Sequence, residues 1–410
     1  MSNKPMNRRD FFKNVAGAGI AAAVASGYSL ASAMDANTPS DSNKPAETSY
    51  PQVPTRKLGR ADINVPVLGI GMMYDTSETQ IVLHKALQWG VSLWDTSHGY
   101  ANGKSEEGLG IFFAKNPEKR KDVFLVSKAS GARDSASRTD RLQTSFKRMN
   151  TNYIDLYYGV HGLDNPADLN DELKQWAADA KAKGQIKYFG FSTHKNMTAC
   201  LNAAAKCDWI DAIMTSYNFR LMQDAEFMAA VDACRAAGIA IIAMKVQAGR
   251  SDKEDEKPLD RHFLDKGFTE GQAKIKTVLQ DDRVASACLG MKNIAMLTSN
   301  VAAVLDKTEL TQNDLEYMST YAKQTCTGYC TACGLCNAAI PQMPYISDVM
   351  RSLMYNNKYG DVKLAKQLFA EVRSKTNVKI GSLDYTAAEN VCPNGNKIGK
   401  LMLEAEKFLA

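Results

Sequence analysis

Short apolar runs alternate with longer amphipathic segments between residues 53 and 308. The short runs have the length of buried strands, whereas the longer segments repeat their apolar residues with helical spacing. This pattern predicts eight strands: Val67–Met72, Ser92–Asp95, Val123–Lys128, Ile154–His161, Lys187–Ser192, Ala212–Asn218, Ile239–Lys245 and Val284–Gly290. It also predicts helices between them, among which are Glu78–Trp89, Thr139–Met149, Asp171–Lys183, Ala225–Ala237 and Ala273–Gln280.

Three glycines mark the ends of predicted helices. Gly90, Gly184 and Gly238 each follow a helix and precede a strand, where a left-handed backbone conformation is favoured. Eight strand–helix units over about 250 residues have the size of a closed parallel barrel, so we predict an α/β fold, a (β/α)8 TIM barrel over 53–308. A doubly wound open sheet is the alternative, which the lack of a G-x-G-x-x-G motif after the first strand disfavours.

The regular order of strands and helices ends after Lys307. An amphipathic helix is predicted over Leu310–Gln324, and a cysteine-rich stretch and further helical segments follow it. We therefore predict a second, mainly helical domain over 309–410. Within the barrel, the mixed charges of Arg250–Phe268 predict a solvated loop. This loop follows the seventh strand and would lie on the catalytic face, where a lid is the alternative interpretation.

The first 33 residues have the composition of an export signal. The pair Arg8-Arg9 precedes two phenylalanines and a mild Gly/Ala-rich run, and Ala31-Ser32-Ala33 offers a cleavage site. These features resemble the bacterial twin-arginine signal, which implies the Tat export machinery and a periplasmic protein. An ordinary secretory signal is the alternative. Residues 34–52 are polar and Pro-containing and predict a flexible linker.

Bulk composition changes this picture little. The chain has 410 residues, is 45% hydrophobic and 23% charged, and carries a formal charge of +5. Much of that charge belongs to the first 33 residues, so the sequence gives no electrostatic reason to expect nucleic-acid binding. Beyond those residues no stretch approaches the roughly 20 apolar residues of a spanning helix, so we expect no transmembrane segment in the mature form.

Polar residues at strand ends are the candidates for chemistry, because the carboxyl ends of parallel barrel strands meet at one mouth. Asp95, Lys128 and His161 end the second, third and fourth strands, and Tyr100 follows Asp95 closely. An ammonium group lowers the pKa of a nearby tyrosine, and a carboxylate holds that ammonium in place. Histidine can donate to a carbonyl oxygen. Together these groups would stabilise a developing alkoxide during hydride delivery.

Several segments resemble, in chain order, the motifs of the aldo/keto reductase family. They span residues 56–300 and comprise Arg56–Gly59 with Val65–Gly71, Trp94–Tyr100 with Ser105–Gly110, Val126–Lys128, Asp155–His161 and Gly184–Ser192. The resemblance implies that Tyr100 is the general acid, Lys128 its pKa modulator, Asp95 the partner of Lys128, and His161 the substrate-orienting donor. It also implies an enzyme that interconverts a carbonyl and an alcohol by hydride transfer from NADP(H) or NAD(H).

The resemblance is weaker where the family holds its nucleotide. Ser192 matches the residue near the nicotinamide carboxamide, whereas Thr193 and Met214 stand where the family often has Asn and Gln. These departures motivate an alternative function, a barrel that no longer catalyses and serves as an electron-transfer or binding module.

The expected adenine end of the nucleotide also departs from the family. Lys292 and Asn300 resemble its segment, but Met296 and Ser299 replace the Arg and Glu often found there. Phosphate contacts are expected from Lys292 and from two further basic residues, Lys245 and Arg250.

Nine cysteines are present, and one group of them has ferredoxin spacing. Cys330, Cys333 and Cys336 form C-x2-C-x2-C, and a Cys-Pro pair occurs far downstream at Cys392. In two-cluster ferredoxins the fourth cysteine of each run ligates the other cluster. The four cysteines are therefore predicted to ligate one [4Fe–4S] cluster, and some aldo/keto reductases resemble this chain in carrying such a domain. The cluster would act as an electron relay, with a redox partner, or as a structural staple.

Two other uses of these cysteines remain open in the sequence. A four-thiolate zinc site usually pairs two C-x2-C knuckles, which this spacing does not supply. Disulfides are compatible with an exported protein, and Cys326 would be available for pairing. Cys326 is also an alternative cluster ligand in place of Cys392.

Overall fold

The structure is a computed structural model, and it describes residues 50–248, 257–325 and 329–410. The predicted export signal and nearly all of the predicted linker lie outside the described residues. Arg250 and Cys326 lie outside them as well.

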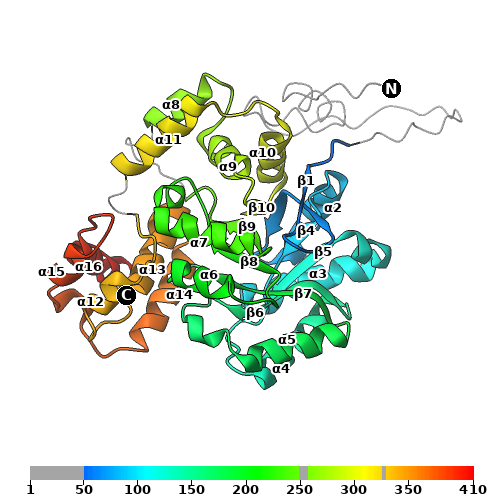
Figure 1. Cartoon of the computed structure of the whole chain (residues 1–410), viewed down its shortest axis with the longest axis horizontal. Coiled ribbons are helices and arrows are strands. Elements are labelled where there is room, and N and C mark those ends of the chain that lie inside the picture. The colour runs from blue at the N-terminus through cyan, green and yellow to red at the C-terminus, as the bar shows by residue number, and fades with distance from the viewer. Residues whose placement is uncertain (1–49, 249–256, 326–328) are drawn as a thin grey trace, which may run out of the picture.

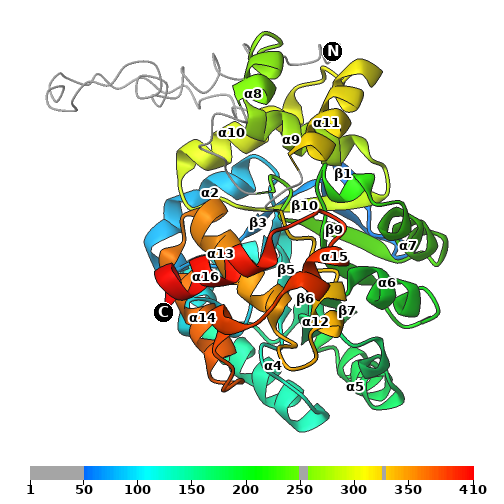
Figure 2. The ribbon, with the colours of Figure 1, turned by 90° about the vertical axis from the view of Figure 1, so that its left-hand side faces the viewer.

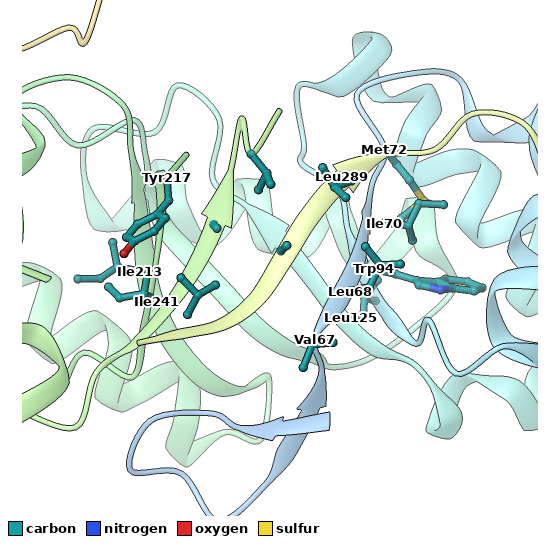
Figure 3. Close-up of a cluster of buried hydrophobic side chains, with 14 of the residues drawn as sticks. Val67, Leu68, Ile70, Met72, Trp94, Leu125, Ile213, Tyr217, Ile241 and Leu289 are labelled. Atoms are coloured by element: carbon teal, nitrogen blue, oxygen red, sulfur yellow. The ribbon is translucent and has the colours of Figure 1, made fainter. Parts of the chain in front are cut away.

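Eight parallel strands form a closed barrel in the order β10-β3-β4-β5-β6-β7-β8-β9. Closure depends on pairing between β10 and β3, which lie side by side in Figure 3. The predicted barrel is therefore confirmed, and the alternative of an open doubly wound sheet is wrong. The strands are β3 (Leu68–Gly71), β4 (Leu93–Asp95), β5 (Phe124–Lys128), β6 (Ile154–His161), β7 (Ile186–Thr193), β8 (Ala212–Ser216), β9 (Ala240–Met244) and β10 (Val284–Gly290).

Helices surround the barrel (Figure 1), and a short hairpin precedes its first strand. The hairpin pairs β1 (Thr55–Lys57) with β2 (Asn64–Pro66). Gly90, Gly184 and Gly238 have φ of 74°, 67° and 73°, so the predicted left-handed caps are confirmed. The surrounding helices are α2 (Gln80–Gln88), α3 (Lys104–Lys115), α4 (Ser135–Met149), α5 (Asp171–Ala182), α6 (Met197–Ala204), α7 (Ala225–Ala236), α9 (Glu270–Gln280) and α10 (Ile294–Leu305).

Alternation along the strands divides the core into two layers. Outward side chains such as Ile70, Trp94 and Leu125 belong to the layer between strands and helices, and Figure 3 shows part of it. Inward side chains such as Leu93 and Val126 fill the barrel itself. The barrel interior is therefore solid over much of its length, and chemistry is confined to the strand ends.

Substitution of Gly190 on β7 would test how closely the adjacent barrel strands approach each other. A Cβ atom there would lie 1.8 Å from the carbonyl oxygen of Ala212 on the adjacent strand. We expect Gly190→Ala to lower the free energy of unfolding by about 3 kcal/mol and the melting temperature by about 5 to 10 °C. Gly290→Ala is the matched control, because its Cβ would lie 4.0 Å from the nearest atom, the Gly71 oxygen. Equal melting temperatures for the two variants would contradict the expected clash.

The predicted solvated loop over Arg250–Phe268 is partly wrong. Residues 257–264 form α8 (Lys257–Leu264), and Leu259 and Phe263 are 0% exposed. They pack with Phe219 and with Met318 of α11 (Gln312–Gln324). The many charged residues of this segment obscure its helical pattern in the sequence, although it forms an amphipathic helix with a buried apolar face. Because α11 shares this core, it packs with the barrel rather than with the helices that follow.

The last part of the chain has a hydrophobic core of its own. It includes Met343, Ile346, Val349, Phe369 and Met402. Figure 2 shows these helices in front of the barrel, across one end of it. No helix of the described residues is long and apolar enough to cross a membrane. The helices are α12 (Leu335–Ala339), α13 (Ile346–Tyr359), α14 (Val362–Arg373), α15 (Thr386–Asn390) and α16 (Ile398–Leu409).

Candidate active site

Strand alternation places Asp95 and Lys128 inside the barrel mouth. Leu93 and Val126 face the interior, so the residues two positions later face it as well. Asp95 is 2% exposed and Lys128 1% exposed. Lys128 Nζ lies 2.6 Å from Asp95 Oδ1 and donates to the Thr96 carbonyl oxygen at 2.7 Å. A buried ammonium is thereby paired and fixed, as its burial requires.

His161 reaches the same mouth through an irregularity in β6. The pairing of β6 with β7 shifts register between Tyr158 and Val160. Tyr158 belongs to the barrel interior, whereas Val160 packs with the outer layer, and His161 then pairs with Ser192. Without the extra residue, His161 would face outward. The bulge therefore turns His161 toward the mouth.

Tyr100 comes from the loop that follows β4. Its backbone N–H donates to the Ser97 carbonyl oxygen, and Ala101 and Asn102 have positive φ, so the chain turns sharply just after the tyrosine. Ser105 anchors the turn from behind, since its hydroxyl donates to the Met72 carbonyl oxygen at 2.6 Å. A tight turn of this kind directs the tyrosine back over the barrel end.

The four predicted residues converge. Lys128 Nζ lies 4.6 Å from the centroid of the Tyr100 ring, and the rings of Tyr100 and His161 are 5.7 Å apart in an edge-on arrangement. His161 Nδ1 lies 2.8 Å from Ser130 Oγ and 3.3 Å from Ser97 Oγ. The structure thus brings together Asp95, Lys128, Tyr100 and His161 and adds two serines that the sequence did not single out.

The protonation of Tyr100 differs from the expectation. Burial raises the pKa of its phenol well above the usual value, and the charge of Asp95 raises it further. The ammonium of Lys128 faces the ring, and the lowering expected from it does not prevail. Tyr100 therefore holds its proton at neutral pH, the state required of a proton donor.

His161 is neutral at the same pH. Burial lowers the pKa of its imidazole to about 3, and the charges of Lys128 and Arg351 contribute to that effect. A neutral imidazole carries one N–H, and the hydrogen bond at one ring nitrogen decides which nitrogen keeps it. The Ser130 hydroxyl lies at Nδ1, so its hydrogen bond determines the tautomer of His161.

The predicted nucleotide residues fall into two groups. Ser192 is 2% exposed at the end of β7, where its hydroxyl accepts from the Gly162 N–H at 3.1 Å, and Lys245 directly follows β9. Both therefore lie at the barrel mouth. Lys292, by contrast, is exposed before α10, and Asn300 is 7% exposed within that helix. The second group does not line either of the two pockets described below.

The C-terminal domain contributes residues to the mouth that the sequence did not predict. Arg351 on α13 donates to His194 Nε2, and Asp348 on the same helix lies 3.1 Å from Lys195. One turn further along, the ring of Tyr355 lies 5.9 Å from Lys245 Nζ. Helix α13 thus extends over the barrel mouth, where Asp95, Tyr100, Lys128 and His161 (the tetrad) lie.

The four predicted cluster cysteines line one pocket. Its empty volume is about 370 Å³, and Cys330, Cys333, Cys336 and Cys392 all face it. Asn394 and Asn396 each donate to the Tyr329 carbonyl oxygen, at 2.8 and 2.9 Å, which ties the downstream loop to the first cysteine run. All eight cysteines within the described ranges are free thiols. Among those residues, no three His, Cys, Asp or Glu side chains are arranged to hold a single metal ion.

Comparisons with known proteins agree with this geometry. The model of the aldo/keto reductase family matches residues 67–323. An uncharacterised oxidoreductase, YqkF of Bacillus subtilis, is 24% identical over 311 residues, covering 66% of this chain and 96% of the relative. The aldo-keto reductase yakc of Schizosaccharomyces pombe, whose name includes NADP(+), is 30% identical over 210 residues, covering 46% of this chain and 60% of the relative.

Solved structures give the same fold. The aldo-keto reductase AKR11C1 from Bacillus halodurans, in its holo form, superposes with a TM-score of 0.56 at 24% identity. The match covers 66% of this chain and 96% of that protein. With the family match spanning more than half of the sequence, the conclusion is plain: this chain belongs to the aldo/keto reductase family.

Proposed function

We propose that this protein reduces a carbonyl compound to an alcohol, and catalyses the reverse reaction, with NADPH or NADH as the hydride donor. The observation that carries the proposal is the convergence of Tyr100, Lys128, Asp95 and His161 at the barrel mouth. Family membership supports an oxidoreductase, and the NADP(+) in the name of the yeast relative supports a nicotinamide cofactor.

The mouth offers groups that fit such a nucleotide. The buried Ser192 hydroxyl and the Lys245 ammonium lie where the strands end, and Lys292 stands exposed before α10. Ser192 would orient the nicotinamide, and the two lysines would contact phosphates. The bound nucleotide supplies the hydride.

Proton transfer belongs to Tyr100. Its phenol holds a proton at neutral pH, and that proton would move to the carbonyl oxygen as negative charge develops there. The ammonium of Lys128, kept in place by Asp95, would then stabilise the tyrosinate. In the reverse direction the tyrosinate accepts the proton again.

Substrate orientation belongs to His161. When Ser130 donates to Nδ1, the single imidazole proton resides on Nε2. That N–H would donate to the carbonyl oxygen from a side other than that of Tyr100. Two donors at one oxygen fix the carbonyl and lower the energy of the alkoxide.

The C-terminal cysteines fit a [4Fe–4S] cluster. They share one pocket, and none of the four is oxidised to a disulfide. In a four-iron cluster each thiolate binds its own iron, so the sulfurs surround a volume, whereas zinc needs all of its ligands about 2.3 Å from one point. Cys330, Cys333, Cys336 and Cys392 would hold the cluster as a structural staple or as a relay to a redox partner.

Export by the twin-arginine route completes the proposal. That route carries folded proteins with their cofactors in place, which suits a chain with both a nucleotide site and a cluster. The support is the motif around Arg8 and Arg9 in the sequence. The working location would then be the periplasm.

Nucleotide binding is the direct test of the proposed activity. Anaerobically purified protein is titrated with NADPH and with NADH. At least one of the two nucleotides should quench the protein fluorescence on binding, and the protein should oxidise that nucleotide when an aldehyde is added. We expect a KM for the nucleotide between about 1 μM and 1 mM. Failure to bind either nucleotide would instead favour the alternative function, an electron-transfer or binding module.

A further inference from the structure

A second pocket lies between the barrel mouth and the C-terminal domain. Its empty volume is about 360 Å³, and both domains line it. Neither domain forms this pocket alone. The barrel contributes the polar residues His194, Ser216 and Lys245. The C-terminal part contributes Tyr329, Thr331, Ser347 and Arg351, and also Cys330, which borders the cysteine pocket as well.

The wall of this pocket carries two basic side chains, Lys245 and Arg351, that no carboxylate of the described residues neutralises. In the part of the chain that the structure describes, neither Lys245 nor Arg351 forms an ion pair with a carboxylate. The acidic residue of α13, Asp348, lies instead against Lys195, 3.1 Å away. Enclosing two cations without an anion is costly, because each loses hydration that no partner replaces.

The Arg351 guanidinium has one hydrogen-bond donor that lacks a partner among the described residues. Its Nη1 donates to His194 Nε2, whereas its Nε is buried without a hydrogen-bond partner. Burial and the charge of Lys245 lower the pKa of His194 well below its usual value, so this ring is neutral and does not repel an anion.

The pocket is next to the reacting groups. His194 of the pocket wall lies beside Gly162, the residue after His161, because a Cβ atom at Gly162 would lie 3.5 Å from His194 Cε1. The charge of Arg351 also helps to lower the pKa of His161. A small molecule whose carbonyl lies against Tyr100 and His161 would therefore extend toward Arg351.

We propose that this pocket binds an anionic group of the carbonyl substrate, a carboxylate or a phosphate, and that Arg351 of the C-terminal domain determines this specificity. The inference rests on the proposed function and narrows its substrate class to anionic carbonyl compounds. Arg351 offers a planar pair of donors that matches a carboxylate. The C-terminal domain then selects the substrate in addition to holding its cysteines.

The test compares a charged and a neutral aldehyde of the same length, 4-oxobutanoate and butanal. In Arg351→Gln we expect the KM for 4-oxobutanoate to rise about 10- to 100-fold, with the KM for butanal and for the nucleotide unchanged. Arg351→Lys should recover part of the loss, since it keeps the charge but not the fork. Arg373→Gln is the control, because Arg373 is 45% exposed on α14 of the same domain.

Other outcomes overturn the inference. A rise only in the KM for the nucleotide would assign the anion to the cofactor phosphates. Equal KM values in wild type and Arg351→Gln would remove Arg351 from recognition, and circular dichroism of both variants separates this result from misfolding. Calorimetric titration with succinate needs no turnover. Binding by wild type and its loss in Arg351→Gln would support the pocket even if no carbonyl were reduced, whereas equal binding by both would exclude it.

Discussion

Replacing Tyr100 with Phe should lower kcat for carbonyl reduction by about 10²- to 10⁴-fold, the contribution typical of a positioned acid. The substitution removes one hydroxyl and keeps the ring that lies against Lys128 and His161. Binding of nucleotide and substrate should therefore change little, and the loss should be in kcat rather than KM. Steady-state kinetics with a saturating nucleotide would measure it.

Tyr158→Phe provides the matched control. Tyr158 is 0% exposed inside the barrel, and its hydroxyl has no hydrogen-bond partner in the described structure. Removing such a hydroxyl costs little, because no bond is broken. We expect kcat to stay within about threefold of wild type. If Tyr100→Phe behaved like this control, the proton would come from elsewhere and the proposed role of Tyr100 would fail.

The second large effect concerns the remote cysteine. In Cys392→Ser we expect the iron content of anaerobically purified protein to fall from about four atoms per chain to a small fraction of that, together with its brown absorbance. Serine is nearly isosteric but supplies no thiolate, and the other three cysteines come from a single short run. Iron and sulfide analysis and the visible spectrum would record the loss.

Cys207→Ser separates this effect from a general sensitivity to cysteine loss. Cys207 lies just after α6 and does not line the pocket of the four proposed ligands. The iron content of Cys207→Ser should therefore match that of wild type. An unchanged spectrum in Cys392→Ser would rule out the cross-run ligand and favour Cys326. Zinc in place of iron in the wild-type protein would overturn the cluster altogether.

The sequence predicted the inner face of the barrel better than its mouth. Asp95 and Lys128 follow buried inward residues at a spacing of two, so their direction can be read from alternation alone. His161 does not follow this alternation, because the extra residue near Gly159 moves the side chains that follow it to the opposite face of the strand. A bulge is decided by packing between strands, which no local pattern records. His161 was found only through its position at the end of a strand and its family motif.

Long-range residues escaped prediction entirely. Arg351 and Tyr355 belong to α13, and the spacing of its apolar residues predicts only an amphipathic helix. Their approach to the tetrad depends on docking between two cores that are far apart in the sequence. The helix α8 was missed for a different reason, since its charges dominate the composition while Leu259 and Phe263 form the buried stripe.

The position of α13 has a consequence for synthesis. The tetrad is encoded by residues 95–161, but the residues that close over it follow residue 328. The ribosome therefore synthesises the residues of the tetrad long before the segment that covers them. The pocket beside them exists only in a completed polypeptide, so a protein cut short before α13 would retain the four residues of the tetrad and lack the helix that covers them.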